Sequence, residues 1–180
     1  MHKERHTLSI IAVLCAVIIY VPHARGIEHA QAFNASMLSG LNKLTIQLDG
    51  VSGEFKPYGL IADPILQRTS ASLTDIGLSV ATLSDSNQDP DVALLNVILN
   101  TNRNPYGFYS YGVSVEVIRK IVLNNPQGGF VTETVWTMGQ TGVVVPTDLS
   151  KINQIIDALV AQFLADFRSQ NPRAASPAER

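Results

Sequence analysis

Two kinds of hydrophobic periodicity follow one another along the chain, and their order predicts the fold. Apolar residues at every second position predict five strands, each with one buried face. Apolar residues spaced three or four apart predict two helices. The predicted strands cover residues 43–48, 78–83, 92–101, 108–123 and 130–138, the last resuming at 143–145 after a kink at 139–142; the predicted helices cover 60–76 and 147–167.

Residues with strong positional preferences set the ends of the two helices. Asp63 is predicted to cap the first helix, because Pro64 behind it suits the first helical turn. Gly77 is predicted to end that helix. Thr147 is predicted to cap the second helix, which carries the clearer apolar stripe and is expected to be the main cover of the sheet.

The last three strands are predicted to form an antiparallel meander. The connections at residues 102–107 and 124–129 both contain Asn, Pro and Gly, which favour chain reversal. Alternation breaks at Ile118 and Arg119 in the long fourth strand. We expect a β-bulge or the sheet edge near that point.

The order of elements predicts the fold class. The first strand, first helix and second strand are expected to form a right-handed crossover with the two strands parallel. The order strand, helix, four strands, helix then predicts an α+β two-layer sandwich, in which a mixed, mostly antiparallel sheet carries both helices on one face. The opposite face bears polar residues and is expected to be wet or covered by a partner: Ser110, Gly112, Ser114 and Glu116, with Thr132 and Thr134.

The N-terminal region has the pattern of a secretory signal peptide. Lys3 and Arg5 precede an apolar run at residues 8–21, and a small-x-small site follows at 30–32. The alternative is an uncleaved membrane anchor formed by residues 8–21. The predicted organisation is a signal peptide or anchor (1–32), a linker (33–40), a single α+β domain (41–169) and a disordered tail (170–180).

Composition excludes several kinds of site. The chain has 180 residues and a net charge of −2, so no basic surplus is available to bind nucleic acid. All four histidines and the single cysteine, Cys15, lie in the first 32 residues. A domain without them has neither a His-based nucleophile triad nor a Cys/His zinc site. No glycine-rich phosphate loop is present, so the sequence predicts no cofactor and no metal.

Carboxylates provide the remaining candidate chemistry. Residues 85–91 place oxygen ligands at alternate positions, as a calcium loop does, but Pro90 stands where the turn needs glycine. We interpret this segment as a solvated acidic loop. Glu116 and Glu133 fall on neighbouring predicted strands and are the candidate pair for glycoside chemistry. The alternative to a catalytic pair is that both carboxylates are simply solvated.

Aromatic residues mark the candidate binding surface. Tyr106 and Phe108 flank a predicted turn tip, which suits contact with a partner or a membrane surface. Trp136 is the only tryptophan and belongs either to the core or to an interface. With Glu116 on the polar face, these are the predicted partner-binding residues: Tyr106, Phe108, Glu116 and Trp136.

The segment from Trp136 through Gly139 to Gly142 resembles a stretch of small uncharacterised exported bacterial proteins. The same group shows a Gly-Leu before the first helix, here at 59–60, and a Gly-Ile-like entry to the second strand, here Gly77-Leu78. The resemblance implies an envelope location and no defined activity. The element order is also distantly similar to envelope assembly and transport accessory lipoproteins, although Cys15 lacks a lipobox.

These observations predict an exported, non-catalytic protein of the periplasm or outer membrane that binds an envelope protein as an accessory or assembly subunit. An inner-membrane location applies if residues 8–21 remain as an anchor, and only then is membrane contact expected. The alternatives are a carboxylate-dependent hydrolase acting on glycans and a small-ligand carrier with a pocket between sheet and helices.

Overall fold

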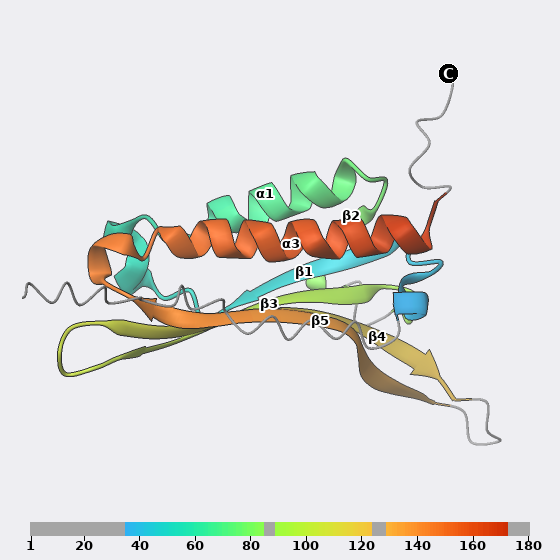
Figure 1. The fold of residues 1–180 in the computed structure, drawn as a ribbon. Coiled ribbons are helices and arrows are strands. Elements are labelled where there is room, and N and C mark those ends of the chain that lie inside the picture. The colour runs from blue at the N-terminus through green and yellow to red at the C-terminus, as the bar shows by residue number, and fades with distance from the viewer. Residues whose placement is uncertain (1–34, 85–88, 124–128, 173–180) are drawn as a thin grey trace, which may run out of the picture.

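The computed structural model describes residues 35–84, 89–123 and 129–172, and it confirms the predicted α+β sandwich. Two helices lie on one face of a five-stranded sheet whose order is β2-β1-β3-β4-β5 (Figure 1). The strands are β1 (Lys43–Asp49), β2 (Ser79–Ala81), β3 (Ala93–Arg103), β4 (Tyr109–Val122) and β5 (Phe130–Val144); the helices are α1 (Ala62–Thr74) and α3 (Lys151–Gln170). Three short 3-10 helices are also described: η1 (Ala35–Leu38), η2 (Gly53–Tyr58) and η3 (Pro146–Asp148).

The first half of the sheet is parallel. β1 pairs with β2 on one side and with β3 on the other, in both cases parallel. The predicted crossover through α1 is therefore confirmed. β2 has only three residues, fewer than the six predicted at 78–83, and it forms one edge of the sheet.

The second half is the predicted antiparallel meander. β3 pairs with β4 from Leu94–Ile118 to Arg103–Tyr109, and β4 pairs with β5 along its whole length. The register shifts between Val117 and Ile118, so the predicted bulge is confirmed. The extra residue is Val135 of β5, which lies between Trp136, the partner of Val117, and Thr134, the partner of Ile118.

The predicted kink in β5 is wrong, because the strand runs unbroken to Val144. Gly139 and Gly142 do not bend the strand; they leave room for atoms of β4 that a side chain would contact. A Cβ at Gly139 would lie 2.9 Å from the carbonyl oxygen of Val113, and one at Gly142 would lie 2.6 Å from the hydroxyl of Tyr111. The tyrosine ring thus covers the bare backbone of its cross-strand neighbour.

The core lies between the sheet and the two helices. Alternate residues of β3 and β4 and the apolar stripe of α3 are buried there together. This stripe is the predicted one, and each such side chain contributes about 1.5–3 kcal/mol. The stripe consists of Ile152, Ile156, Leu159, Val160, Phe163 and Phe167.

Both predicted N-caps are wrong. Helix α1 starts at Ala62, so Asp63 lies inside its first turn, and Ile61 occupies the cap position without a side-chain bond. Thr147 lies within η3, because Pro146 starts a separate 3-10 turn before α3. Gly77 has a φ of 83° and ends the turn after α1 as predicted.

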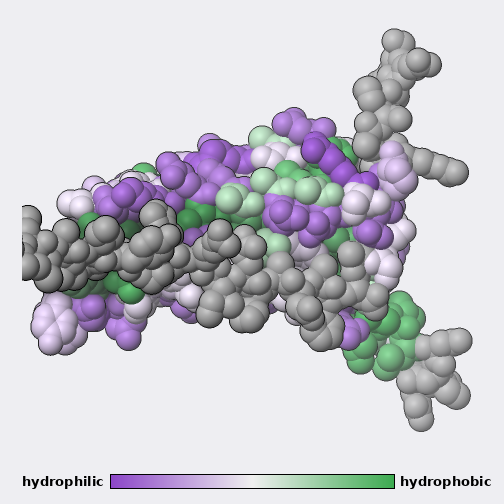
Figure 2. Space-filling model, in the orientation of Figure 1, coloured by the Kyte–Doolittle hydropathy of each residue, from purple (hydrophilic) through white to green (hydrophobic). Residues whose placement is uncertain are grey.

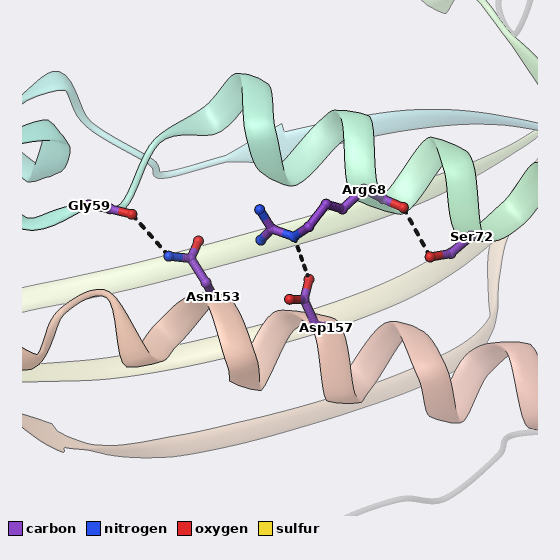
Figure 3. Close-up of polar contacts among 5 residues, drawn as sticks. All are labelled: Gly59, Arg68, Ser72, Asn153 and Asp157. Carbon is purple, nitrogen blue, oxygen red and sulfur yellow. Dashed lines mark hydrogen bonds and ion pairs between the residues drawn. The ribbon is translucent and has the colours of Figure 1, made fainter.

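The two helices are joined by polar contacts on their exposed sides (Figure 3). Arg68 Nε of α1 lies 3.3 Å from Asp157 Oδ1 of α3. Asn153 Nδ2 donates to the carbonyl of Gly59, at 3.0 Å. These contacts fix the N-terminal part of α3 beside the entry to α1.

The segment preceding β1, which falls in the predicted linker at 33–40, contributes to the core. Leu38 is fully buried. Arg119 Nη1 donates to the carbonyls of Met37 and Ser39, at 2.6 and 3.4 Å. Asn171, after α3, donates from Nδ2 to the carbonyl of Leu38 at 2.9 Å. The predicted leader at 1–32 and most of the predicted tail lie outside the described residues.

Candidate binding surfaces

The sheet face opposite the helices carries the predicted polar side chains. No described helix packs on it, and its exposed or partly buried residues come from β3, β4 and β5 and from β1, where Gln47 and Asp49 lie beside Asn96 and Ile98. We call this surface the polar sheet face and define it by Asn96, Asn100, Ser110, Ser114, Glu116, Thr134, Thr137 and Thr141. Three partly buried aliphatic residues lie among them, namely Leu94, Ile98 and Ile118.

One acceptor on this face has no partner. The side-chain oxygen of Asn96 is buried, and no described group donates a hydrogen bond to it. Asn96 is the cross-strand partner of Glu116. An unpaired buried acceptor is costly to the folded state.

Tyr106 and Phe108 lie together in the turn between β3 and β4, at one end of the polar sheet face. Asn104 organises this turn, since its Oδ1 accepts from the backbone nitrogens of Tyr106 and Phe108, at 2.9 and 3.1 Å. Gly107 has a φ of 86°, which suits glycine. Tyr106 is 87% exposed, so the turn presents its ring to solvent.

A shallow groove of about 570 Å³ lies beside this turn, between the end of β5 and the start of α3. Phe108 and Tyr111 form one wall, and Ile155 and Ala158 of α3 form the other. Asp148 and Lys151 at its rim form an ion pair in which Nζ lies 2.6 Å from Oδ2. The groove can therefore hold an apolar group next to a charged edge.

The candidate carboxylate pair is not assembled. Glu116 pairs with Thr137, whereas Glu133 pairs with Arg119 on the other side of the bulge. Glu116 belongs to the polar sheet face, and Glu133 shares the opposite face with Arg119 because neighbouring pairs alternate in direction. These two carboxylates cannot converge on one glycosidic bond.

Trp136 lies in the core and not on the predicted binding surface. Its side chain is fully buried, and its ring meets that of Phe163 edge-on with centroids 5.4 Å apart. Indole Nε1 donates to Asp166 Oδ2 at 2.9 Å. Of the four predicted residues, Tyr106 and Phe108 are adjacent, Glu116 lies farther along the polar sheet face, and Trp136 cannot contact a partner.

A further exposed apolar cluster was missed by the sequence predictions. The ends of β4 and β5 next to residues 124–128 carry Ile121, Val122, Leu123, Phe130 and Val131, which we call the apolar ribbon end. It forms a green cluster on the projecting hairpin in Figure 2. The available signal was a run of consecutive apolar residues on both sides of a predicted turn, because a half-buried strand alternates instead.

The described residues contain no group of three or more His, Cys, Asp or Glu side chains placed to hold a metal ion. The acidic segment considered as a calcium loop falls partly at 85–88, outside the described residues. Within the described ranges, no helix is both long and apolar enough to cross a membrane.

Comparison with protein-family models gives no match, and comparison with curated proteins gives none. Two solved structures show a distant likeness. A dodecameric PelC variant from Paraburkholderia phytofirmans is 15% identical with a TM-score of 0.37, over 71% of this chain and 88% of that one. A minor lipoprotein from Acinetobacter baumannii is 16% identical with a TM-score of 0.32, over 74% of this chain and 95% of that one. At these values neither likeness carries an argument about this chain.

Proposed function

We propose that this protein is an exported, non-catalytic binding subunit of the bacterial cell envelope, and that the polar sheet face binds its protein partner. The observation that carries the proposal is the composition of that face. Aliphatic side chains of Leu94, Ile98 and Ile118 lie among Asn, Ser and Thr side chains, with no described helix over them.

This composition suits a protein interface better than a solvated surface. Interfaces have an apolar centre, few charges at that centre and a polar rim with about one hydrogen bond per 100–200 Å². The three aliphatic residues supply the centre, and two carboxylates border it: Glu116 on β4 and Asp49 on β1, next to Ile98.

The proposed compartment rests on the sequence. The apolar run at 8–21 after a basic start is typical of a secretory leader, and the described domain contains no cysteine that an oxidising compartment would pair. The Tyr106 ring at the end of the polar sheet face gives the partner an aromatic anchor, a residue type enriched at binding hot spots.

In-cell photo-crosslinking tests the proposal. A photoreactive residue at Asn100 or Thr141, both exposed on the polar sheet face, should give one discrete adduct. The same residue at Ala161, exposed on α3, is the matched control and should give none. Ile98→Asp should abolish the adduct while the protein stays folded. Adducts from all three positions, or from Ala161 alone, would refute the role of this face.

The groove beside Phe108 supports a second candidate function, a carrier of a small apolar ligand. Its volume of about 570 Å³ falls within the range of roughly 300–1,000 Å³ that ligand sites occupy. A bound acyl chain would lie along Ile155 and Ala158. Ala158→Trp should fill the groove and remove binding of a fluorescent fatty acid, and unchanged binding would exclude this site.

A further inference from the structure

The apolar ribbon end is a two-stranded extension of the sheet. β3 stops pairing at Leu94–Ile118, whereas β4 and β5 continue to pair as far as Val122–Phe130. Beyond Ile118 the ribbon therefore has no third strand beside it, and it projects from the body (Figure 1).

Apolar side chains occupy both faces of this ribbon. Val122 and Phe130 are cross-strand partners on one face, and Ile121 and Val131 are partners on the other. Val122 is 68% exposed, Phe130 54% and Val131 42%. A protein partner that covers one face leaves the other in water, whereas an apolar medium around the ribbon removes both from water at once.

A basic side chain borders the cluster on the side of the body. Lys120 Nζ lies 5.2 Å from the ring centroid of Phe130, so the ammonium group is held over the aromatic face. Lysines beside aromatic residues suit the boundary between hydrocarbon and headgroups, because the stem is apolar and the charge reaches the headgroups.

The chain outside the described residues joins the body at the foot of the same ribbon. Arg119, the next residue toward the body, holds η1 through the carbonyls of Met37 and Ser39. The apolar run at 8–21 precedes η1, and an extended chain from Val21 to Ala35 spans at most about 50 Å. The ribbon and the point at which residues 1–34 join the domain thus lie at one end of the molecule.

We propose that the apolar ribbon end inserts into the interfacial region of a lipid bilayer, on the side of the molecule where the leader segment joins the domain. Two apolar cross-strand pairs, Ile121–Val131 and Val122–Phe130, at about 3.3 Å each give an apolar length of about 7 Å, which lies within the depth of roughly 5–10 Å reached by interfacial elements. The membrane contact uses a different surface from the polar sheet face. The inference therefore does not depend on whether that face binds a protein.

A matched pair of probe sites tests the proposal in the full chain. Val122 and Val143 are both valines, both 68% exposed, and lie at opposite ends of the β4–β5 hairpin. Each is replaced by cysteine in a Cys15→Ser background and labelled with a nitrobenzoxadiazole fluorophore. The labelled proteins are mixed with vesicles of phosphatidylethanolamine and phosphatidylglycerol, and flotation verifies that they bind.

Vesicles should shift the emission to the blue and raise its intensity at position 122 but not at position 143. Phe130→Ser should lower the ratio of inserted to free ribbon about tenfold, because it removes half-exposed aromatic surface from the inserted state. Equal responses at the two positions, no response at 122, or failure to float would overturn the inference. An increase in fluorescence at position 122 that occurs without vesicles and grows with protein concentration would show that the ribbon binds a second copy of the chain. That result would also overturn the inference.

Discussion

Replacement of Trp136 by phenylalanine tests whether the hydrogen bond between sheet and helix stabilises the fold. The indole is fully buried at the bulge in β5 and donates to Asp166 of α3 at 2.9 Å. Phenylalanine keeps an aromatic ring against Phe163 but removes the donor and part of the ring volume. The variant therefore separates the polar contact and local volume from the rest of the packing.

The expected cost is about 3 kcal/mol of unfolding free energy. A hydrogen bond to a charged acceptor contributes about 1.5–3 kcal/mol, and the lower end applies here because Asp166 is only partly buried. The missing ring atoms leave a small cavity that costs a further 1–2 kcal/mol or so. Total stabilities of roughly 5–15 kcal/mol make this loss readily measurable.

Urea unfolding followed by far-UV circular dichroism is the assay, since the variant lacks the only tryptophan and fluorescence cannot compare the two proteins. Asp166→Ala and the double variant complete a cycle. The bond from Gln162 to Asp166 is lost in both Asp166 backgrounds and cancels. The coupling energy should be about 1–1.5 kcal/mol. Additive effects, or a loss below about 1 kcal/mol for Trp136→Phe, would refute the reasoning.

Three further predictions follow from local geometry. Gly50 and Gly77 both have a φ of 83°, but a Cβ at Gly50 would lie 1.8 Å from a β3 carbonyl oxygen, whereas Gly77 faces open space. In urea unfolding, Gly50→Ala should lower the unfolding free energy by more than about 3 kcal/mol, and Gly77→Ala by only about 1–2 kcal/mol. Asn171→Ala should cost about 1–2 kcal/mol and speed limited proteolysis near η1, because two hydrogen bonds to that segment are lost. The Arg68–Asp157 pair should show a double-mutant coupling below about 0.5 kcal/mol that falls with added salt, since both side chains are nearly half exposed; a coupling above 1 kcal/mol or so would contradict this.

The sheet was predictable because its register is encoded by alternation. In β3 the buried residues Leu95, Val97 and Leu99 recur at every second position, so a shift by one residue would expose all of them. The helix starts were not predictable from single residues. Thr147 is a good cap residue in isolation, but Pro146 before it begins a 3-10 turn that delays α3 to Lys151.

The candidate site was predictable only in part, because exposure depends on pairing between distant segments. Tyr106 could be assigned to a turn tip from the residues around it. Trp136 could not be placed by alternation alone, since its direction depends on a bulge in the same strand. The consecutive apolar residues of β4 and β5 indicated two apolar faces at the apolar ribbon end. Their exposure could not be predicted, because it depends on where β3 stops.

The bulge connects the core to the ribbon. Val135 is the extra residue between the partners of Val117 and Ile118, and both it and Trp136 point into the core. One inserted residue reverses the direction of all residues on its N-terminal side, since side chains alternate along a strand. Without it, Phe130 would share the helix-facing side with Trp136; with it, Phe130 joins Val122 on the side of the polar sheet face. The contact of Trp136 with α3 therefore fixes the register that decides which side of the ribbon carries its aromatic residue.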